Sequence, residues 1–198
     1  MKTKLVHQQI SESIKVKTMI MEDPIILEKI IDITKACISS LSNNGKIIFC
    51  GNGGSFADSQ HLSAEFTSKF LFDRPALASI ALGTNSSGMT AMGNDYGYDN
   101  VFAREIEAVA KSEDTLIAIT TSGDSMNILK AVEVAKKMSI QTFVLTGESG
   151  GKISSRANCI KVPSSDTPRI QESHILIGHI ICGFVEAEMF KNQNNQGQ

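Results

Sequence analysis

One stretch of the sequence, Lys46 to Phe70, constrains the fold more than any other. An apolar run at 47–50 breaks into the loop GNGGS at 51–55, and polar and apolar residues then recur at helical spacing. This pattern predicts a β-strand, a tight loop and an α-helix. The stretch is therefore expected to be the start of a βα unit.

The loop has the composition of an anion site. Gly51, Gly53 and Gly54 permit backbone conformations that other residues avoid, and they let a ligand approach the main chain closely. Asn52 or Ser55 could accept hydrogen bonds from the free amides at the helix start. A phosphate group would be a suitable ligand for such a loop. Glycine-rich turns of this kind also occur without any ligand, so the loop alone leaves both interpretations open.

On the helix that follows, His61 and Glu65 are four residues apart and thus on one face, about one turn from each other. An imidazole and a carboxylate so placed could share a proton or a metal ion. The same spacing is also common in solvated ion pairs, so this pair too has two interpretations.

Length and charge exclude several classes of protein. A chain of 198 residues, 41% hydrophobic and 20% charged, is long enough for one domain with a substantial core. Its 19 basic and 21 acidic residues provide no broad basic field for nucleic acid or an anionic membrane. The N-terminal residues lack the apolar core of a signal peptide, and no run reaches membrane-spanning length. We expect a cytoplasmic protein.

The four cysteines show no metal-binding spacing and have apolar neighbours, which predicts buried, reduced thiols rather than disulfides. They are Cys37, Cys50, Cys159 and Cys182.

Five apolar runs alternate with helical patterns along the chain, at 47–50, 76–82, 115–120, 141–145 and 159–162. This alternation predicts an α/β fold, a three-layer α/β/α sandwich with a five-stranded parallel sheet. We assign residues 1–198 to one domain, with an N-terminal helical hairpin in 1–44, the α/β core in 45–190 and a disordered tail in 191–198. The hairpin could cover the sheet or pack against another copy of the chain.

A second candidate ligand loop, Thr120 to Ser125 (TTSGDS), lies between the third predicted strand and the helix at 126–138. Hydroxyls and free amides at a helix N-terminus complement a phosphate, although serine and threonine are also ordinary helix caps. Asp124 would have to point away from such a ligand. Because both loops follow parallel strands, they are expected to open at the same edge of the sheet.

These residues resemble those of a known family, the phosphoheptose isomerases within the sugar isomerase (SIS) domain proteins. The matching motifs cover nearly the whole chain and comprise CGNGGS (50–55) with Asp58, His61 and Glu65, then Arg74-Pro75, Gly93-Asn94-Asp95, Thr121-Ser122-Gly123 with Ser125, Leu145-Thr146-Gly147, Gly150-Gly151-Lys152, and Arg169-Ile170-Gln171-Glu172 with His174 and His179. Thr120 and Phe56 stand where other members have serine and histidine, and neither change threatens the chemistry.

The resemblance implies a SIS, flavodoxin-like fold and a homotetramer with active sites at subunit interfaces. It implies conversion of sedoheptulose 7-phosphate into D-glycero-D-manno-heptose 7-phosphate through an enediol, the first step toward ADP-heptose or GDP-heptose for lipopolysaccharide or other surface glycans. Glu65 and His179 would be the catalytic pair. The substrate would be bound by Asn52, Gly53, Gly54, Ser55, Glu65, Asn94, Asp95, Thr120, Thr121, Ser122, Ser125 and Gln171.

The resemblance also implies one zinc ion per subunit, bound by His61, Glu65, Gln171 and His179. Gln171 and His179 are eight residues apart, roughly 12 Å of helical rise, so both would reach one ion only if their side chains lean together or different chains contribute. Other SIS domains are non-catalytic and act as sugar-phosphate-binding regulators or bind the replication initiator. Such a protein needs no acid/base pair, so the presence of both Glu65 and His179 favours the enzyme.

Overall fold

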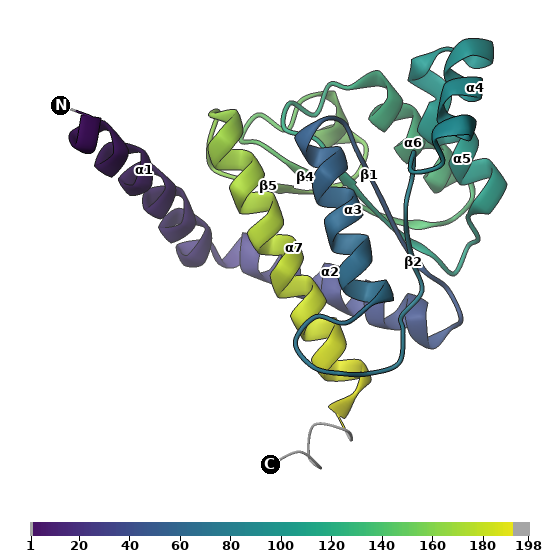
Figure 1. The fold of residues 1–198 in the computed structure, drawn as a ribbon, viewed down its shortest axis with the longest axis horizontal. Helices are drawn as coiled ribbons and strands as arrows, with labels where there is room; N and C mark the ends of the chain where they lie inside the picture. The colour runs from purple at the N-terminus through teal and green to yellow at the C-terminus, as the bar shows by residue number, and fades with distance from the viewer. Residues whose placement is uncertain (1, 192–198) are drawn as a thin grey trace.

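The computed structural model describes residues 2–191, and the alternation of strands and helices expected from the sequence is confirmed (Figure 1). The strands are β1 (Ile47–Gly51), β2 (Ser79–Ala81), β3 (Thr115–Ile119), β4 (Gln141–Thr146) and β5 (Asn158–Lys161). The helices are α1 (Lys2–Glu22), α2 (Pro24–Ser42), α3 (Gly54–Thr67), α4 (Ser86–Tyr96), α5 (Val101–Val109), α6 (Met126–Lys137) and α7 (Thr167–Met189), with short 3-10 helices η1 (Tyr98–Asn100) and η2 (Lys152–Ser155). Except for Lys191, the tail predicted to be disordered lies outside the described residues.

The five strands form one parallel sheet in the order β2-β1-β3-β4-β5. This is the flavodoxin-like order, in which the chain runs outward in opposite directions from β1 and β3. All residues of these two central strands are buried, as expected for strands covered on both faces. Ligands in such sheets bind beyond the carboxyl ends of the strands at this switch point, so the loops after β1 and β3 border the expected crevice.

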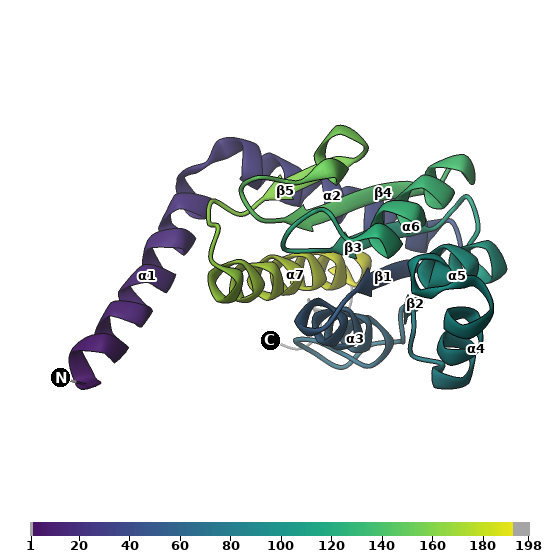
Figure 2. The ribbon, with the colours of Figure 1, turned by 90° about the horizontal axis from the view of Figure 1, so that it is seen from above.

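Alternate residues of the strands belong to two separate cores, which confirms the three layers. Ile47 and Phe49 of β1 pack in a core with residues of α2, α3 and α7. Ile48 and Cys50 point to the other face, where α5 and α6 supply most of the packing. On the first face α3 and α7 lie side by side, as Figures 1 and 2 both show.

The two N-terminal helices have different roles. Asp23 caps α2 by accepting hydrogen bonds from the backbone N–H groups of Ile25 (2.8 Å) and Ile26 (3.2 Å), with Pro24 in the first turn. This helix covers the sheet beside α7. Instead of folding back along α2 as a closed hairpin, α1 projects from the body (Figures 1 and 2). Five of its apolar side chains are more than half exposed, namely Leu5, Val6, Ile10, Ile14 and Met21.

The four cysteines are all buried and free, as expected. Burial raises the pKa of Cys37 and of Cys50 to about 12, so both remain protonated thiols at neutral pH. None of the helices in residues 2–191 combines the length and the hydropathy that a membrane-spanning segment requires.

His174 of α7 is buried against the end of β4. Its Nε2 lies 3.1 Å from the backbone oxygen of Thr146, to which it donates a hydrogen bond, while its Nδ1 is buried without a partner among the described residues. Burial lowers the pKa of His174 to about 4, because the charged imidazolium would lose its hydration. The imidazole is therefore neutral in the folded chain at pH 7.

This burial predicts that acid destabilises the protein. The folded-state pKa lies below the ordinary value of 6.5, so the contribution of His174 is complete above pH 6.5 and is lost as the pH falls toward 4. When the pH is lowered from 7.5 to 5, the loss of this contribution should lower the free energy of unfolding by about 2 kcal/mol. Urea unfolding of His174→Gln should lack this part of the pH dependence, whereas His7→Gln, which removes an exposed imidazole, should keep it. Equal pH dependence in wild type and His174→Gln would contradict the assignment.

Candidate active site

The glycine loop after β1 leaves the start of α3 open. Gly53 has φ of +55° and would meet nothing within 4 Å if it carried a Cβ, so its face is free for a ligand. The prediction that Asn52 or Ser55 caps α3 is wrong, since no side chain of the described residues caps this helix. Of the first amides of α3, those of Ser55 and Phe56 donate to the backbone oxygens of Asn52 (3.0 Å) and Gly53 (3.1 Å), so within the described residues it is the N–H of Gly54 that keeps its donor capacity.

The hydroxyl loop at 120–125 follows β3 on the other side of the switch point. Thr120 is buried, and its Oγ1 accepts a hydrogen bond from the Gly123 N–H at 3.3 Å. Thr121 and Ser122 line a cavity of about 210 Å³ together with residues of the loops after β4 and β5. Ser125 is the N-cap residue of α6, and its own side chain accepts no capping hydrogen bond from the helix. Thr121, Ser122 and Ser125 are therefore the accessible hydroxyls of the loop.

Asp124 points out of this loop, as the sequence required of a carboxylate beside an anion site. Its Oδ1 accepts a hydrogen bond from the backbone N–H of Lys152 at 3.0 Å. The turn at 150–152 packs so closely on the hydroxyl loop that a Cβ on Gly123 would lie 2.2 Å from the backbone oxygen of Gly150. The Gly-Gly-Lys motif thus holds the hydroxyl loop in place.

Asn94 and Asp95 lie at the end of α4, a helix without buried residues, and hydrogen-bond to each other (2.8 Å) at the surface. The contact that joins this segment to the glycine loop comes from Tyr98, whose hydroxyl donates to Asn52 Oδ1 at 3.0 Å. The segment of Asn94 and Asp95 is therefore joined to the glycine loop by Tyr98, a residue that the sequence analysis did not single out.

The predicted catalytic pair meets between α3 and α7. Nε2 of His61 lies 3.1 Å from Glu65 Oε1 and 3.0 Å from Nε2 of His179, and one ligand atom of each residue lies within 4.8 Å of the others. The two helices can approach because residue 178 is glycine, where a Cβ would lie 2.5 Å from Leu62. The ring of Phe70 stacks on His179 with 5.4 Å between centroids.

The electrostatics of the cluster favour a neutral His179. Burial lowers its pKa, and the neighbouring His61 adds to the effect, while Glu65 opposes it. A neutral imidazole can accept a proton or bind a metal ion. The pair of His61 and Glu65 predicted from spacing is thus part of a three-residue cluster.

Gln171 lies at the other end of the helix pair. A Cβ on Gly54 would lie 2.5 Å from Gln171 Nε2, so this side chain rests on the start of α3, about 10 Å along the helix from His61. The structure therefore brings together three of the four predicted metal ligands within one chain, and it places the fourth, Gln171, beside the glycine loop.

A buried ion pair, Arg74 with Glu186, holds the chain segments that carry the cluster. Nε of Arg74 lies 3.0 Å from Glu186 Oε1, and both side chains are 1% exposed. The guanidinium also donates to the backbone oxygens of Glu65 (2.7 Å), Phe66 (2.7 Å) and Ser68 (2.9 Å), which satisfies carbonyls at the end of α3.

Glu186 binds the segment after α3 in turn. Its carboxylate accepts hydrogen bonds from the backbone N–H groups of Phe70 (2.9 Å) and Leu71 (2.7 Å). One ion pair thus holds both the helix end that carries Glu65 and the segment that carries Phe70 against His179. In the sequence, Arg74 stood out only as part of the family motif Arg74-Pro75, and nothing there connects it with Glu186.

Comparisons with known proteins agree with this geometry. A family profile described as the SIS domain matches residues 18–147. The chain is 49% identical over 189 residues to a phosphoheptose isomerase of Aneurinibacillus thermoaerophilus, covering 95% of this chain and 96% of that protein. It is 51% identical over 181 residues to phosphoheptose isomerase 2 of Campylobacter jejuni, covering 91% and 90%.

Two solved structures are similar over nearly their whole length. A phosphoheptose isomerase from Neisseria gonorrhoeae superposes with a TM-score of 0.86 at 38% identity, covering 93% of this chain and 99% of that chain. One from Francisella tularensis superposes with a TM-score of 0.88 at 36% identity, covering 94% and 98%.

Proposed function

Because the chain belongs to the SIS-domain family, as one of its phosphoheptose isomerases, we propose that it converts sedoheptulose 7-phosphate into D-glycero-D-manno-heptose 7-phosphate. The observation that carries the proposal is the cluster in which Glu65 and His179, far apart in the sequence, come together beside His61. The product would enter the synthesis of nucleotide-activated heptose for lipopolysaccharide or another surface glycan, and the enzyme would act in the cytoplasm.

The reaction moves two protons. A ketose becomes an aldose when a proton leaves the carbon beside the carbonyl and returns to the neighbouring carbon, while a second proton passes between the two oxygens. An enediol is the intermediate. In our proposal Glu65 takes the carbon-bound proton. His179, held neutral by burial, transfers the second proton between the two sugar oxygens. The hydroxyls of Thr121, Ser122 and Ser125 hold the phosphate, with the glycine loop on the other side of the crevice.

The assay is direct. Sedoheptulose 7-phosphate incubated with the protein should yield aldose, and pentose and hexose phosphates should react more slowly. Ser122→Ala should raise KM more than it lowers kcat, because a remote phosphate is held alike in the ground state and the transition state. A sugar-phosphate-binding regulator, the alternative function, would bind these compounds and convert none of them.

The cluster fits a zinc ion. Two imidazoles and one carboxylate converge, which matches the three-ligand, open-position set of catalytic zinc sites, so His61, Glu65 and His179 would hold the ion. Because coordination lowers the basicity of a ligand, Glu65 and His179 would transfer protons only while they are not bound to the ion. Bound there, zinc would stabilise the negative charge that develops on the sugar oxygen. Gln171 would join this site only from another subunit, since its own position is beside Gly54.

We predict about one zinc per chain, and a metal content at least tenfold lower in His61→Ala, since loss of one of three protein ligands weakens a site strongly. Elemental analysis after dialysis measures this. Replacement of an exposed histidine outside the cluster, His7→Ala, provides the control and should leave the metal content unchanged. Equal zinc in wild type and His61→Ala would exclude the proposed ligands.

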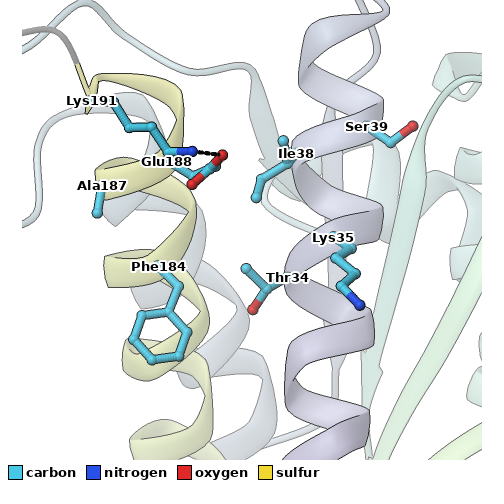
Figure 3. Close-up of a pocket in the computed structure, with 8 residues that line it drawn as sticks. All are labelled: Thr34, Lys35, Ile38, Ser39, Phe184, Ala187, Glu188 and Lys191. Carbon is cyan, nitrogen blue, oxygen red and sulfur yellow. Dashed lines mark ion pairs between the residues drawn. The ribbon is translucent and has the colours of Figure 1, made fainter.

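We also propose that the protein is a homotetramer. Apolar grooves of about 710 and 810 Å³ lie between α2 and α7 and share Phe184 and Ala187. Figure 3 shows the first, with the partly buried Ile38 of α2 and the exposed Phe184 of α7 among its lining residues, and with the ion pair of Glu188 and Lys191. The second groove includes His179, so a covering subunit would complete the surroundings of the cluster.

Light scattering after size exclusion should give a mass of about four chains at micromolar concentration, because the grooves and the apolar side of α1 are too extensive for a monomer surface. Changing Ile10 and Ile14 of α1 together to Gln should lower this mass. The matched double change Gln8→Ala with Gln9→Ala, on the same helix, should not. A monomeric wild type would refute the assembly.

A further inference from the structure

The side chains of Asn52 and Asn127 form a reciprocal amide pair. Asn52 Nδ2 donates to Asn127 Oδ1 at 2.9 Å, and Asn127 Nδ2 donates to Asn52 Oδ1 at 2.8 Å. The backbone N–H of Ile128 also donates to Asn127 Oδ1 at 3.0 Å. Because a backbone N–H can only donate, this third bond fixes which end of the Asn127 amide is oxygen, and the orientation of Asn52 follows.

The pair lies at the switch point of the sheet. Asn52 is the first residue after β1, and Asn127 is the second residue of α6, directly after the hydroxyl loop that follows β3. The two strands are neighbours, with Gly51 opposite Ile119 at their ends. The amide pair therefore crosses from the glycine loop to the hydroxyl loop, which are the two sides of the crevice.

Burial makes this bridge rigid. Asn127 is 3% exposed, so breaking the pair would leave its amide without water or a protein partner. Tyr98 strengthens the bridge from a third segment by donating to Asn52 Oδ1 at 3.0 Å. With its oxygen bonded twice and one of its N–H groups used, the Asn52 side chain has little capacity left for a ligand.

We propose that Asn127 and Tyr98 are positioning residues, which hold Asn52 and thereby fix the distance between the glycine loop and the hydroxyl loop. A ligand that spans both loops, an open-chain sugar phosphate of set length, needs this distance, whereas inorganic phosphate bound to the hydroxyl loop alone does not. The inference rests on the proposed function, because it takes a sugar phosphate as the ligand.

The test compares Asn127→Ala, Asn52→Ala and their double variant with wild type. Calorimetric titration with sedoheptulose 7-phosphate should show the dissociation constant raised about tenfold in Asn127→Ala and by more in Asn52→Ala, because both variants break the two hydrogen bonds of the amide pair and Asn52→Ala also removes the acceptor of Tyr98. The double variant should bind no more weakly than Asn52→Ala. The dissociation constant of inorganic phosphate should change less than threefold. Tyr98→Phe, which removes one bond, should weaken sugar binding about threefold.

Two further readouts separate positioning from mere stabilisation. The preference for sedoheptulose 7-phosphate over a pentulose 5-phosphate should shrink in Asn127→Ala, and kcat at saturation should fall less than threefold while KM rises. Asn158→Ala, which removes an exposed amide on β5, is the matched control and should change none of these values.

The proposal is overturned if the increases in the dissociation constant of the two single variants multiply in the double variant. It is overturned equally if the variants weaken the binding of inorganic phosphate as much as the binding of sugar phosphate. It is also overturned if sugar binding is unchanged while thermal stability falls. A wild type that binds sedoheptulose 7-phosphate without converting it would instead count against the proposed function, and the comparison of variants would still decide the role of the pair.

Discussion

Glu65→Gln is expected to lower kcat about a thousandfold, since positioned general bases contribute 10²- to 10⁴-fold. The amide has the shape of the carboxylate and cannot take a proton from carbon. KM should change little, because the phosphate is held by the hydroxyl loop. Hydrogen exchange at C1 of the sugar in heavy water reports the carbon step itself and should fall by the same factor.

The structure sharpens this experiment in two ways. Glu65 Oε1 lies 3.1 Å from His61, so Glu65→Gln also alters the proposed zinc site, and metal content must be measured alongside the rate. Glu107→Gln, an exposed carboxylate on α5, is the matched control and should retain full activity. A Glu65→Gln variant that keeps its metal and exchanges C1 hydrogen at the wild-type rate would transfer the role of base to His179.

Local patterns in the sequence predicted the sheet and its two ligand loops. The apolar runs, the glycines at 51–54 and the hydroxyls at 120–125 each indicate a structure within a few residues, which is the range over which such patterns are reliable. The expectation that the carboxylate of Asp124 points away from the hydroxyl loop rested on the repulsion between like charges alone. The caps of α3 were predicted wrongly, because Asn52 is bonded to Asn127 across the sheet and not to its own helix.

Contacts between distant segments could not be predicted in the same way. His61 and Glu65 lie one turn apart on one helix, so spacing indicated the pair, but His179 joins them only because Gly178 lets α7 approach α3. Gln171 shares α7 with His179, and the helical rise already placed the two far apart. No local pattern links Arg74 with Glu186, and their pairing depends on the packed tertiary structure.

The second large prediction concerns the buried ion pair of Arg74 and Glu186. Arg74→Met should lower the free energy of unfolding by about 3–5 kcal/mol, because Glu186 would remain charged in the interior without its cation and the carbonyls at the end of α3 would lose their donors. Arg104→Met is the matched control, since Arg104 is 46% exposed and lies 3.8 Å from Glu107, and such surface pairs contribute about 1 kcal/mol or less. Urea unfolding at one fixed protein concentration compares the three chains.

The double variant Arg74→Met with Glu186→Gln decides whether the charge or the packing dominates. If the uncompensated carboxylate causes the loss, neutralising it should recover part of the stability, and the double variant should be more stable than Arg74→Met alone. If the lost carbonyl contacts dominate, the two changes should add. In either case kcat should fall even where the chain remains folded, because the end of α3 that carries Glu65 loses the guanidinium that binds its carbonyls, and Glu186, which holds the segment of Phe70, loses its cation. A folded Arg74→Met variant with wild-type kcat would show that the positions of Glu65 and His179 do not depend on this ion pair.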